Sequence, residues 1–120
     1  MDPRPSAHVQ DGAVTVAGRR CTACRYPSAQ DTGVCPVCRG PLEDAAFGPD
    51  GEVFASTVLR VRVPGHRPPM GVAYLVLDDG PRILVHTPGD RPLPPGARAR
   101  LTSVTDAGDV LAELQEDPWT

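Results

Sequence analysis

The stretch CTACRYPSAQDTGVCPVC, residues 21–38, contains two Cys-x-x-Cys pairs and determines how the front of the chain folds. Two residues between cysteines let the backbone turn so that both sulfurs point toward one place. A second turn alongside completes a tetrahedron of thiolates about 2.3 Å from a metal ion. Gly33 and Gly40 lie beside the second pair and permit tight turns. The pattern predicts a zinc ribbon over residues 19–42, with one structural zinc ion bound by Cys21, Cys24, Cys35 and Cys38.

Other uses of paired cysteines fit this sequence less well. Disulfides belong to oxidising compartments, and residues 1–17 lack the apolar core of a signal peptide. A redox-active Cys-x-x-Cys occurs singly, at a helix start in a βαβ unit. Iron bound by the same four thiolates stays open as the alternative to zinc. A closed four-thiolate site has no free coordination position for water, so the metal is expected to be structural and not catalytic.

The segments that flank the ribbon are short. The alternating run Ala13–Ala17 predicts a brief strand within an N-terminal arm of residues 1–18. On the other side of the ribbon, residues 43–50 have the composition of a linker.

From Gly51 onward the sequence reads as strand after strand. Expected strands cover residues 53–63, 71–77, 82–87, 98–104 and 109–114, separated by Pro/Gly-rich turns such as Asp78-Asp79-Gly80. Only residues 110–115 admit a helical turn instead. In the first strand, one face is expected to hold Val53, Ala55, Thr57, Leu59, Val61 and Val63. A mostly β chain follows, with a five-stranded OB-fold barrel over residues 51–114 and a tail over 115–120. An SH3-like barrel is the structural alternative.

Composition narrows the choice of partners. The 120 residues carry 12 basic and 15 acidic side chains, a net charge of −3, and every basic residue is arginine. A mildly acidic chain gives no electrostatic reason to expect nucleic acid, and the absence of lysine is read as codon bias. The apolar runs, such as Val72–Leu77, are too short to span a bilayer. A cytoplasmic protein without a membrane segment is expected.

Five motifs in this order resemble one known family. They are Arg20–Cys24, Cys35–Cys38, Gly51–Val58, Pro69–Arg82 and Gly96–Leu101. The chain resembles the rubredoxin-like zinc-ribbon plus OB-fold family, a domain of unknown function associated with thiolases, HMG-CoA synthases and steroid side-chain aldolases. The chain departs from that family at Arg25, where glycine is common, and at residues 29–31, where Pro-Pro-Arg is common.

The resemblance implies a role and a set of partners. It implies a non-catalytic accessory subunit that stabilises a thiolase-like enzyme and helps to shape its acyl-CoA channel. It also allows a hydratase-type subunit and a direct acyl-CoA contact. No nucleophile elbow, phosphate-binding glycine loop or second metal constellation accompanies the motifs, which agrees with a chain that is not itself an enzyme.

Candidate contact residues outside the ribbon are few. His66, Arg67 and Met70 lie in the loop between the first two barrel strands, where OB-folds often bind ligands, although a plain solvent-exposed loop is an even alternative. Arg82 follows the Asp-Gly turn and faces either a partner or solvent. His86 is expected on an outer surface or facing a partner, and Trp119 either as an anchor to a partner or in a loose terminus.

Two rival functions remain open. Zinc ribbons and OB-folds both bind single-stranded nucleic acid, but such grooves need positive charge and stacking aromatics. Electron transfer is the third possibility and requires iron in the four-cysteine site.

Overall fold

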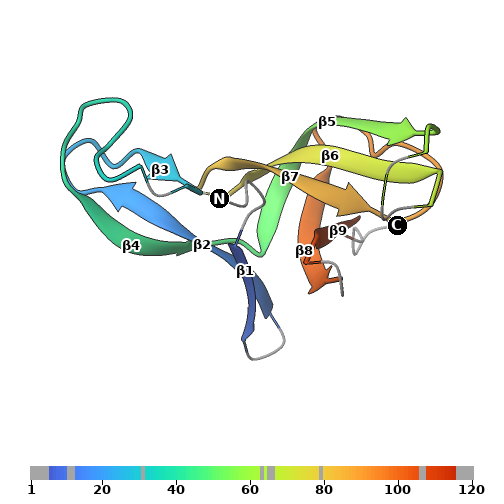
Figure 1. The fold of residues 1–120 in the computed structure, drawn as a ribbon, viewed down its shortest axis with the longest axis horizontal. Coiled ribbons are helices and arrows are strands. Elements are labelled where there is room, and N and C mark those ends of the chain that lie inside the picture. The colour runs from blue at the N-terminus through green and yellow to red at the C-terminus, as the bar shows by residue number, and fades with distance from the viewer. Residues whose placement is uncertain are drawn as a thin grey trace.

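The computed structural model describes residues 6–10, 13–30, 32–62, 64, 67–78, 80–105 and 108–115, and every regular element in them is a strand. The strands are β1 (Ser6–Gln10), β2 (Ala13–Cys21), β3 (Pro27–Ser28), β4 (Leu42–Phe47), β5 (Asp50–Leu59), β6 (Met70–Leu77), β7 (Arg82–Thr87), β8 (Arg98–Val104) and β9 (Val110–Leu114). They form a small N-terminal sheet beside a closed barrel (Figure 1). Across these ranges, no helix is long and apolar enough to cross a bilayer.

The barrel has the strand order β5-β6-β7-β9-β8, closed by pairing of β8 with β5. Neighbouring strands are antiparallel except β7 and β9, which run parallel and pair at His86 and Leu111. This order is that of the OB-fold, so the predicted fold class is confirmed. The final strand spans residues 110–114, and the helical alternative for this segment is wrong. Side chains that alternate inward fill the barrel, among them Val53, Leu75, Leu77, Ile83, Val85, Leu101 and Val110.

The first barrel strand differs from the expected alternation. The pairing of β5 with β6 shifts by one residue between Val53 and Ala55, which is a β-bulge. Val53 is buried, but beyond the bulge Ala55 and Thr57 point outward, and Ser56 and Val58 are half-buried. The expected single face was therefore wrong after Val53. The strand also ends at Leu59, and Val61 is exposed beyond it, while Val63 lies outside the described residues.

The N-terminal sheet is built around β2. One end of β2 pairs with β1, and the other end pairs with β3 and β4. The interval 43–50, expected to be a linker, instead holds most of β4 and the start of β5, with only Gly48 and Pro49 between them. This strand lacks β-branched residues and forms because it pairs with β2 over Val16–Cys21.

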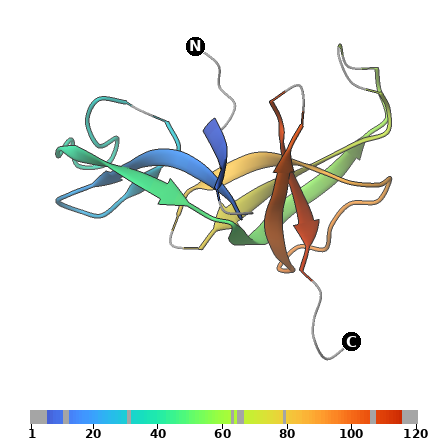
Figure 2. The same ribbon diagram turned by 90° about the horizontal axis from the view of Figure 1, so that it is seen from below.

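The sheet and the barrel share one core. Val14, Val16 and Phe47 from the sheet belong to the same cluster of buried residues as Leu77 and Leu101 from the barrel. The two parts lie side by side in both ribbon views (Figure 2). Because β4 runs almost directly into β5, the ribbon is held against the barrel at a fixed place.

Candidate functional site

Two backbone turns bring the four cysteines together. Cys21 ends β2, and Cys24 follows in the first turn; Cys35 and Cys38 belong to the second. All four Sγ atoms lie within 4.8 Å of one another, an arrangement able to hold a metal ion. The Sγ atoms of Cys21 and Cys38 are 3.4 Å apart. Those of Cys24 and Cys35 are 3.7 Å apart. One cysteine of each pair is buried, Cys21 and Cys35, and the other is exposed.

The two turns have the same local structure. In the first, the N–H groups of Ala23 and Cys24 point at Cys21 Sγ, at 3.4 and 3.3 Å. In the second, the N–H groups of Val37 and Cys38 point at Cys35 Sγ, at 3.4 and 3.5 Å. Each turn therefore directs two main-chain donors at its buried sulfur.

An arginine closes each turn in a left-handed backbone conformation. Arg25, with φ 68°, donates its N–H to the carbonyl of Cys21 at 3.1 Å. Arg39, with φ 64°, donates to the carbonyl of Cys35 at 2.9 Å. Residues other than glycine rarely adopt this conformation, so the backbone at both positions favours glycine over arginine.

The main-chain donors change the acidity of the thiols. The pKa of Cys21 is lowered to about 6, first because the N–H of Cys24 bonds to its sulfur. The pKa of Cys35 is also lowered: burial raises it, but the N–H groups of Cys38 and Val37 lower it more. The N–H of Tyr26 lowers the pKa of Cys24, but burial and the three other thiols together raise it more, to about 12. The two buried sulfurs thus favour the thiolate form in which cysteine binds a metal.

A glycine packs directly on the sulfurs. A Cβ atom at Gly40 would lie 3.2 Å from the Sγ atoms of Cys21 and of Cys38. The carbonyl of Gly40 also accepts the N–H of Cys35 at 2.9 Å. Residue 40 therefore needs the absence of a side chain for space, not for backbone freedom. The four sulfurs make a closed donor set suited to a structural metal.

The loop residues proposed from the sequence do not gather with the others. Met70 starts β6 and is half-buried opposite Leu59, and Arg67 is exposed in the loop before it. Arg82 lies at the far end of the β6–β7 ladder, opposite Val76. His66 and Trp119 lie outside the described residues.

Sequence reasoning missed an exposed aromatic cluster around Arg82. The Arg82 guanidinium lies over the rings of Phe54 and Tyr74, 4.8 and 5.4 Å from their centroids. The side chains of Phe54, Tyr74 and Leu84 are large and apolar but 56, 47 and 48% exposed. We call this surface, together with Val76, the aromatic face. Its signal was available in the sequence, because apolar residues also occupy the outward positions of β6 and β7. Phe54 faces outward by the ordinary alternation that follows the buried Val53.

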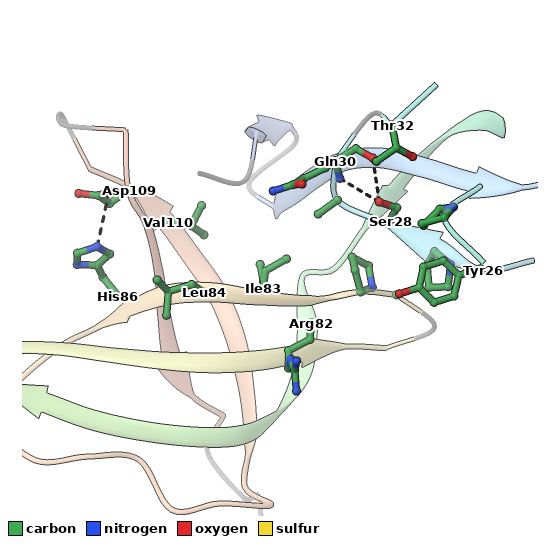
Figure 3. A pocket seen from close by; sticks show the side chains of 15 residues that line it. Tyr26, Ser28, Gln30, Thr32, Arg82, Ile83, Leu84, His86, Asp109 and Val110 are labelled. Carbon is green, nitrogen blue, oxygen red and sulfur yellow. Dashed lines mark hydrogen bonds and ion pairs between the residues drawn. The ribbon is translucent and has the colours of Figure 1, made fainter. Parts of the chain in front are cut away.

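A groove separates the ribbon from the barrel beside the aromatic face. It encloses about 670 Å³ and is lined on the ribbon side by residues 26–30, Thr32 and Pro36. The barrel side is lined by residues 80–84, His86, Asp109 and Val110. Figure 3 shows Ser28, Gln30 and Thr32 facing β7 across this space. We call it the ribbon–barrel groove.

Polar groups in the groove are engaged with their neighbours. His86 Nε2 lies 3.6 Å from Asp109 Oδ1, and Asp109 is only 8% exposed. On the ribbon wall, opposite His86, the Ser28 hydroxyl donates to the carbonyl of Gln30 at 2.8 Å (Figure 3). This serine and this histidine therefore come from different walls and do not form a nucleophile–base pair.

Comparison with known proteins gives the fold. No protein-family model matches the chain. No curated protein matches it either. Among solved structures, a chain of the Ltp2-ChsH2(DUF35) aldolase superposes with a TM-score of 0.68 at 21% identity, over 82% of this chain and 83% of that chain. The barrel, residues 50–115, is little more than half of the 120 residues, so the likeness includes the ribbon sheet as well as the barrel.

Proposed function

We propose that this chain is a non-catalytic accessory subunit of a thiolase-like acyl-CoA enzyme, which it stabilises and whose acyl-CoA channel it helps to shape. The observation that carries the proposal is the likeness, across more than four-fifths of both chains, to a chain of the Ltp2-ChsH2(DUF35) aldolase. A shared fold does not by itself give a shared function. The proposal therefore also depends on the surfaces of this chain.

The aromatic face supports a role in binding a partner. Tyrosine and arginine are enriched among the residues that dominate binding energy at interfaces, where they lie near the centre of a desolvated patch. Phe54, Tyr74 and Arg82 form such a group while remaining exposed. A contiguous exposed apolar surface on a small protein marks an interaction site more often than chance. This face is where we place the main contact with the enzyme.

A second contact is proposed at the loop between β5 and β6. Arg67 suits a CoA phosphate, since arginine binds phosphates through several parallel N–H groups. Met70 suits the pantetheine arm or an apolar partner surface. His66 belongs to the same loop in the sequence. A hydratase-type subunit is a further proposed partner.

We propose zinc as the metal and the cytoplasm as the compartment. Four cysteine thiolates in a closed set are the usual ligands of structural zinc. The sulfurs at 3.4 and 3.7 Å from one another need reducing surroundings to remain ligands and not disulfides. When bound, zinc would hold Cys21, Cys24, Cys35 and Cys38 and fix the ribbon, without taking part in chemistry.

Co-expression with the thiolase-like enzyme encoded by an adjacent reading frame tests the proposal. We expect the two chains to co-purify by size exclusion, and Arg82→Glu to weaken the complex at least about tenfold, as for an interface hot spot. Arg91→Glu makes the same charge change at an exposed residue in the loop after β7, outside both the aromatic face and the β5–β6 loop, and serves as the control. If the enzyme is soluble and active when expressed alone, and does not bind this chain when the two are expressed together, the proposal is contradicted.

The aromatic face also favours one rival function. Bases stack on aromatic rings next to arginine in single-stranded nucleic-acid binders, and the Arg82 guanidinium lies over the rings of both Phe54 and Tyr74. The net charge of −3 opposes this interpretation. A labelled oligonucleotide shifted at low micromolar protein, with strong salt dependence, would favour it over the accessory role.

A further inference from the structure

Among the residues that the structure describes, the main-chain edge of β7 that faces the ribbon–barrel groove pairs with a neighbouring strand only at His86. The N–H of Leu77 donates to the carbonyl of Pro81 at 3.1 Å, which fixes the alternation of the β6–β7 ladder. Ile83 and Val85 therefore exchange their main-chain hydrogen bonds with β6. Arg82 and Leu84 direct their N–H and C=O groups to the opposite edge.

The strand on that opposite edge, β9, begins too late to reach these groups. β9 starts at Val110, and its pairing with β7 is at His86 and Leu111. The preceding residue, Asp109, is turned toward β8: its carbonyl accepts the N–H of Thr105 at 2.8 Å, and its own N–H bonds to the Thr105 hydroxyl at 3.1 Å. In the described part of the chain, no strand pairs with Arg82 and Leu84 on this edge.

The unpaired edge lies in a groove and not on an open surface. Arg82, Ile83 and Leu84 line the ribbon–barrel groove, and the ribbon forms its opposite wall (Figure 3). A strand edge with free donors and acceptors is a template for another strand. The free N–H and C=O groups of Arg82 and those of Leu84 are separated by about 6.8 Å, which is twice the rise per residue of an antiparallel strand. The hydrogen-bonding groups of an extended polypeptide repeat at the same spacing and can therefore pair with them.

We propose that an extended segment of the partner enzyme adds to β7 as a strand in this groove, with an acidic residue placed against Arg82. This inference rests on the proposed function and names the surface that the partner uses. In this arrangement the main chain of the partner segment pairs with β7 in the groove, and its side chains contact the adjoining aromatic face. The two surfaces are continuous because Arg82 and Leu84 belong to both.

Charge supports an acidic residue in the added segment. Arg98 is paired with Asp78, Arg100 with Asp50 at 3.1 Å and Arg25 with Glu43 at 2.9 Å. Among the described residues, by contrast, no carboxylate lies within ion-pair distance of Arg82, whose guanidinium lies over two aromatic rings. A carboxylate from the partner would therefore complete the environment of Arg82.

The ribbon wall argues against a second copy of this chain as the occupant. Pairing of two β7 edges would place the whole barrel of the second copy in the groove, where the ribbon wall obstructs it. A single extended segment from a partner enters the groove without that obstruction.

Amide exchange measured by NMR on the free chain and on its complex tests the inference. In the free chain we expect the amides of Arg82 and Leu84 to exchange fast and those of Ile83 and Val85 slowly. In the complex, exchange at Arg82 and Leu84 should slow by about tenfold or more, as a new main-chain hydrogen bond predicts. If the complex forms and these two amides exchange as before, the inference is wrong and the proposed function stands.

A pair of variants at one residue gives a second test. Leu84→Pro removes an N–H that makes no hydrogen bond to β6. Proline is tolerated at such positions, where the missing N–H faces away from the neighbouring strand. Leu84→Ala keeps the N–H and removes the side chain. We expect the proline variant to bind the partner at least about tenfold more weakly than the alanine variant. Equal binding by two folded variants overturns the inference, and if the proline variant does not fold, the exchange measurement on the unmodified chain decides.

Two further outcomes separate a failure of the proposed function from a failure of the strand-addition inference alone. If the chain and the enzyme do not associate at all, the proposed function fails and the inference fails with it. If Arg82 and Leu84 become protected in the free chain as its concentration rises, the edge pairs copies of this chain, and the inference is overturned.

Discussion

Gly80, in the turn between β6 and β7, lies against the ring of Phe47, and a Cβ atom at residue 80 would be 2.9 Å from Phe47 Cδ1. Phe47 is 3% exposed and comes from β4 of the ribbon sheet. On the other side of the ring, a Cβ atom at Gly18 would lie 2.9 Å from Cε2. Two glycines thus clear the space for one aromatic ring that joins the ribbon to the barrel.

Replacement of Gly80 by alanine should loosen this junction. The added methyl group meets a buried ring, so we expect the free energy of unfolding to fall by about 1–3 kcal/mol, as in overpacked cores. Urea unfolding measures the change. The double variant with Phe47→Leu, which makes room for the methyl group, should be less destabilised than the sum of the two single variants. Additive effects would show that the two residues are not coupled.

The barrel was predictable from the sequence because its signals are local. Alternating or continuous apolar runs and the Asp-Gly turn specify β6 and β7, and the observed bounds, 70–77 and 82–87, differ from the expected ones by one residue at most. The two Cys-x-x-Cys pairs are equally local, and the structure brings their four sulfurs together.

The features that the sequence did not reveal depend on pairing between distant segments. The bulge after Val53 changes which side chains of β5 face inward, and no residue pattern marks it. β4 has the composition of a linker and becomes a strand only beside β2. The groove exists because Phe47 fixes the ribbon next to β7, a contact that joins segments far apart in the chain.

Loss of one sulfur should release the metal. Cys24 is exposed, so Cys24→Ser removes a ligand with little change in packing. We expect the wild-type chain to be colourless and to carry one zinc ion, and the serine variant to carry none, as measured by elemental analysis. A ligand present at a hundredfold excess over its dissociation constant adds about 2.7 kcal/mol to the free energy of unfolding. The free energy of unfolding of the variant should therefore be lower than that of the wild type by at least about this amount. Cys24→His, which supplies a nitrogen ligand, should keep zinc. A metal-free and fully folded wild-type chain contradicts the metal site.

Gly40→Ala tests the packing around the sulfurs. The methyl group would lie 3.2 Å from the Sγ atoms of Cys21 and Cys38, closer than an ordinary van der Waals contact. We expect weaker metal retention against a chelator, by about tenfold, because the sulfurs must shift from their common centre. The control is Gly33→Ala, which has a positive φ of 81° and nothing within 4 Å of the added atom. That variant should lose stability through backbone strain and keep its metal affinity. Equal effects on the metal would show that strain alone matters.

The Asp78–Arg98 pair predicts how stability changes with pH. Arg98 Nη1 donates to Asp78 Oδ1 at 2.9 Å, and Nη2 donates to Oδ2, which ties the β6–β7 turn to β8. The hydrogen bonds from Arg98 lower the pKa of Asp78, while burial opposes the shift and the charge of Arg98 adds to it. Because the folded pKa lies below the unfolded value of about 3.9, the unfolded chain binds the proton more tightly. The contribution of the pair is therefore complete above the unfolded pKa and is lost as the pH falls through the folded pKa.

Asp78→Asn isolates this contribution. We expect the difference in unfolding free energy between wild type and variant to be constant from pH 7 to pH 5 and to shrink toward zero as the pH falls through the lowered pKa of folded Asp78, below which both forms are uncharged at residue 78. Added salt at pH 7 should also reduce the difference, since the pair is partly exposed. Asp90→Asn changes an exposed carboxylate in the loop after β7 and is the control, for which the difference should be small at every pH. A difference at residue 78 that persists unchanged at pH 2.5 would mean that the asparagine disturbs the turn itself and not the ion pair.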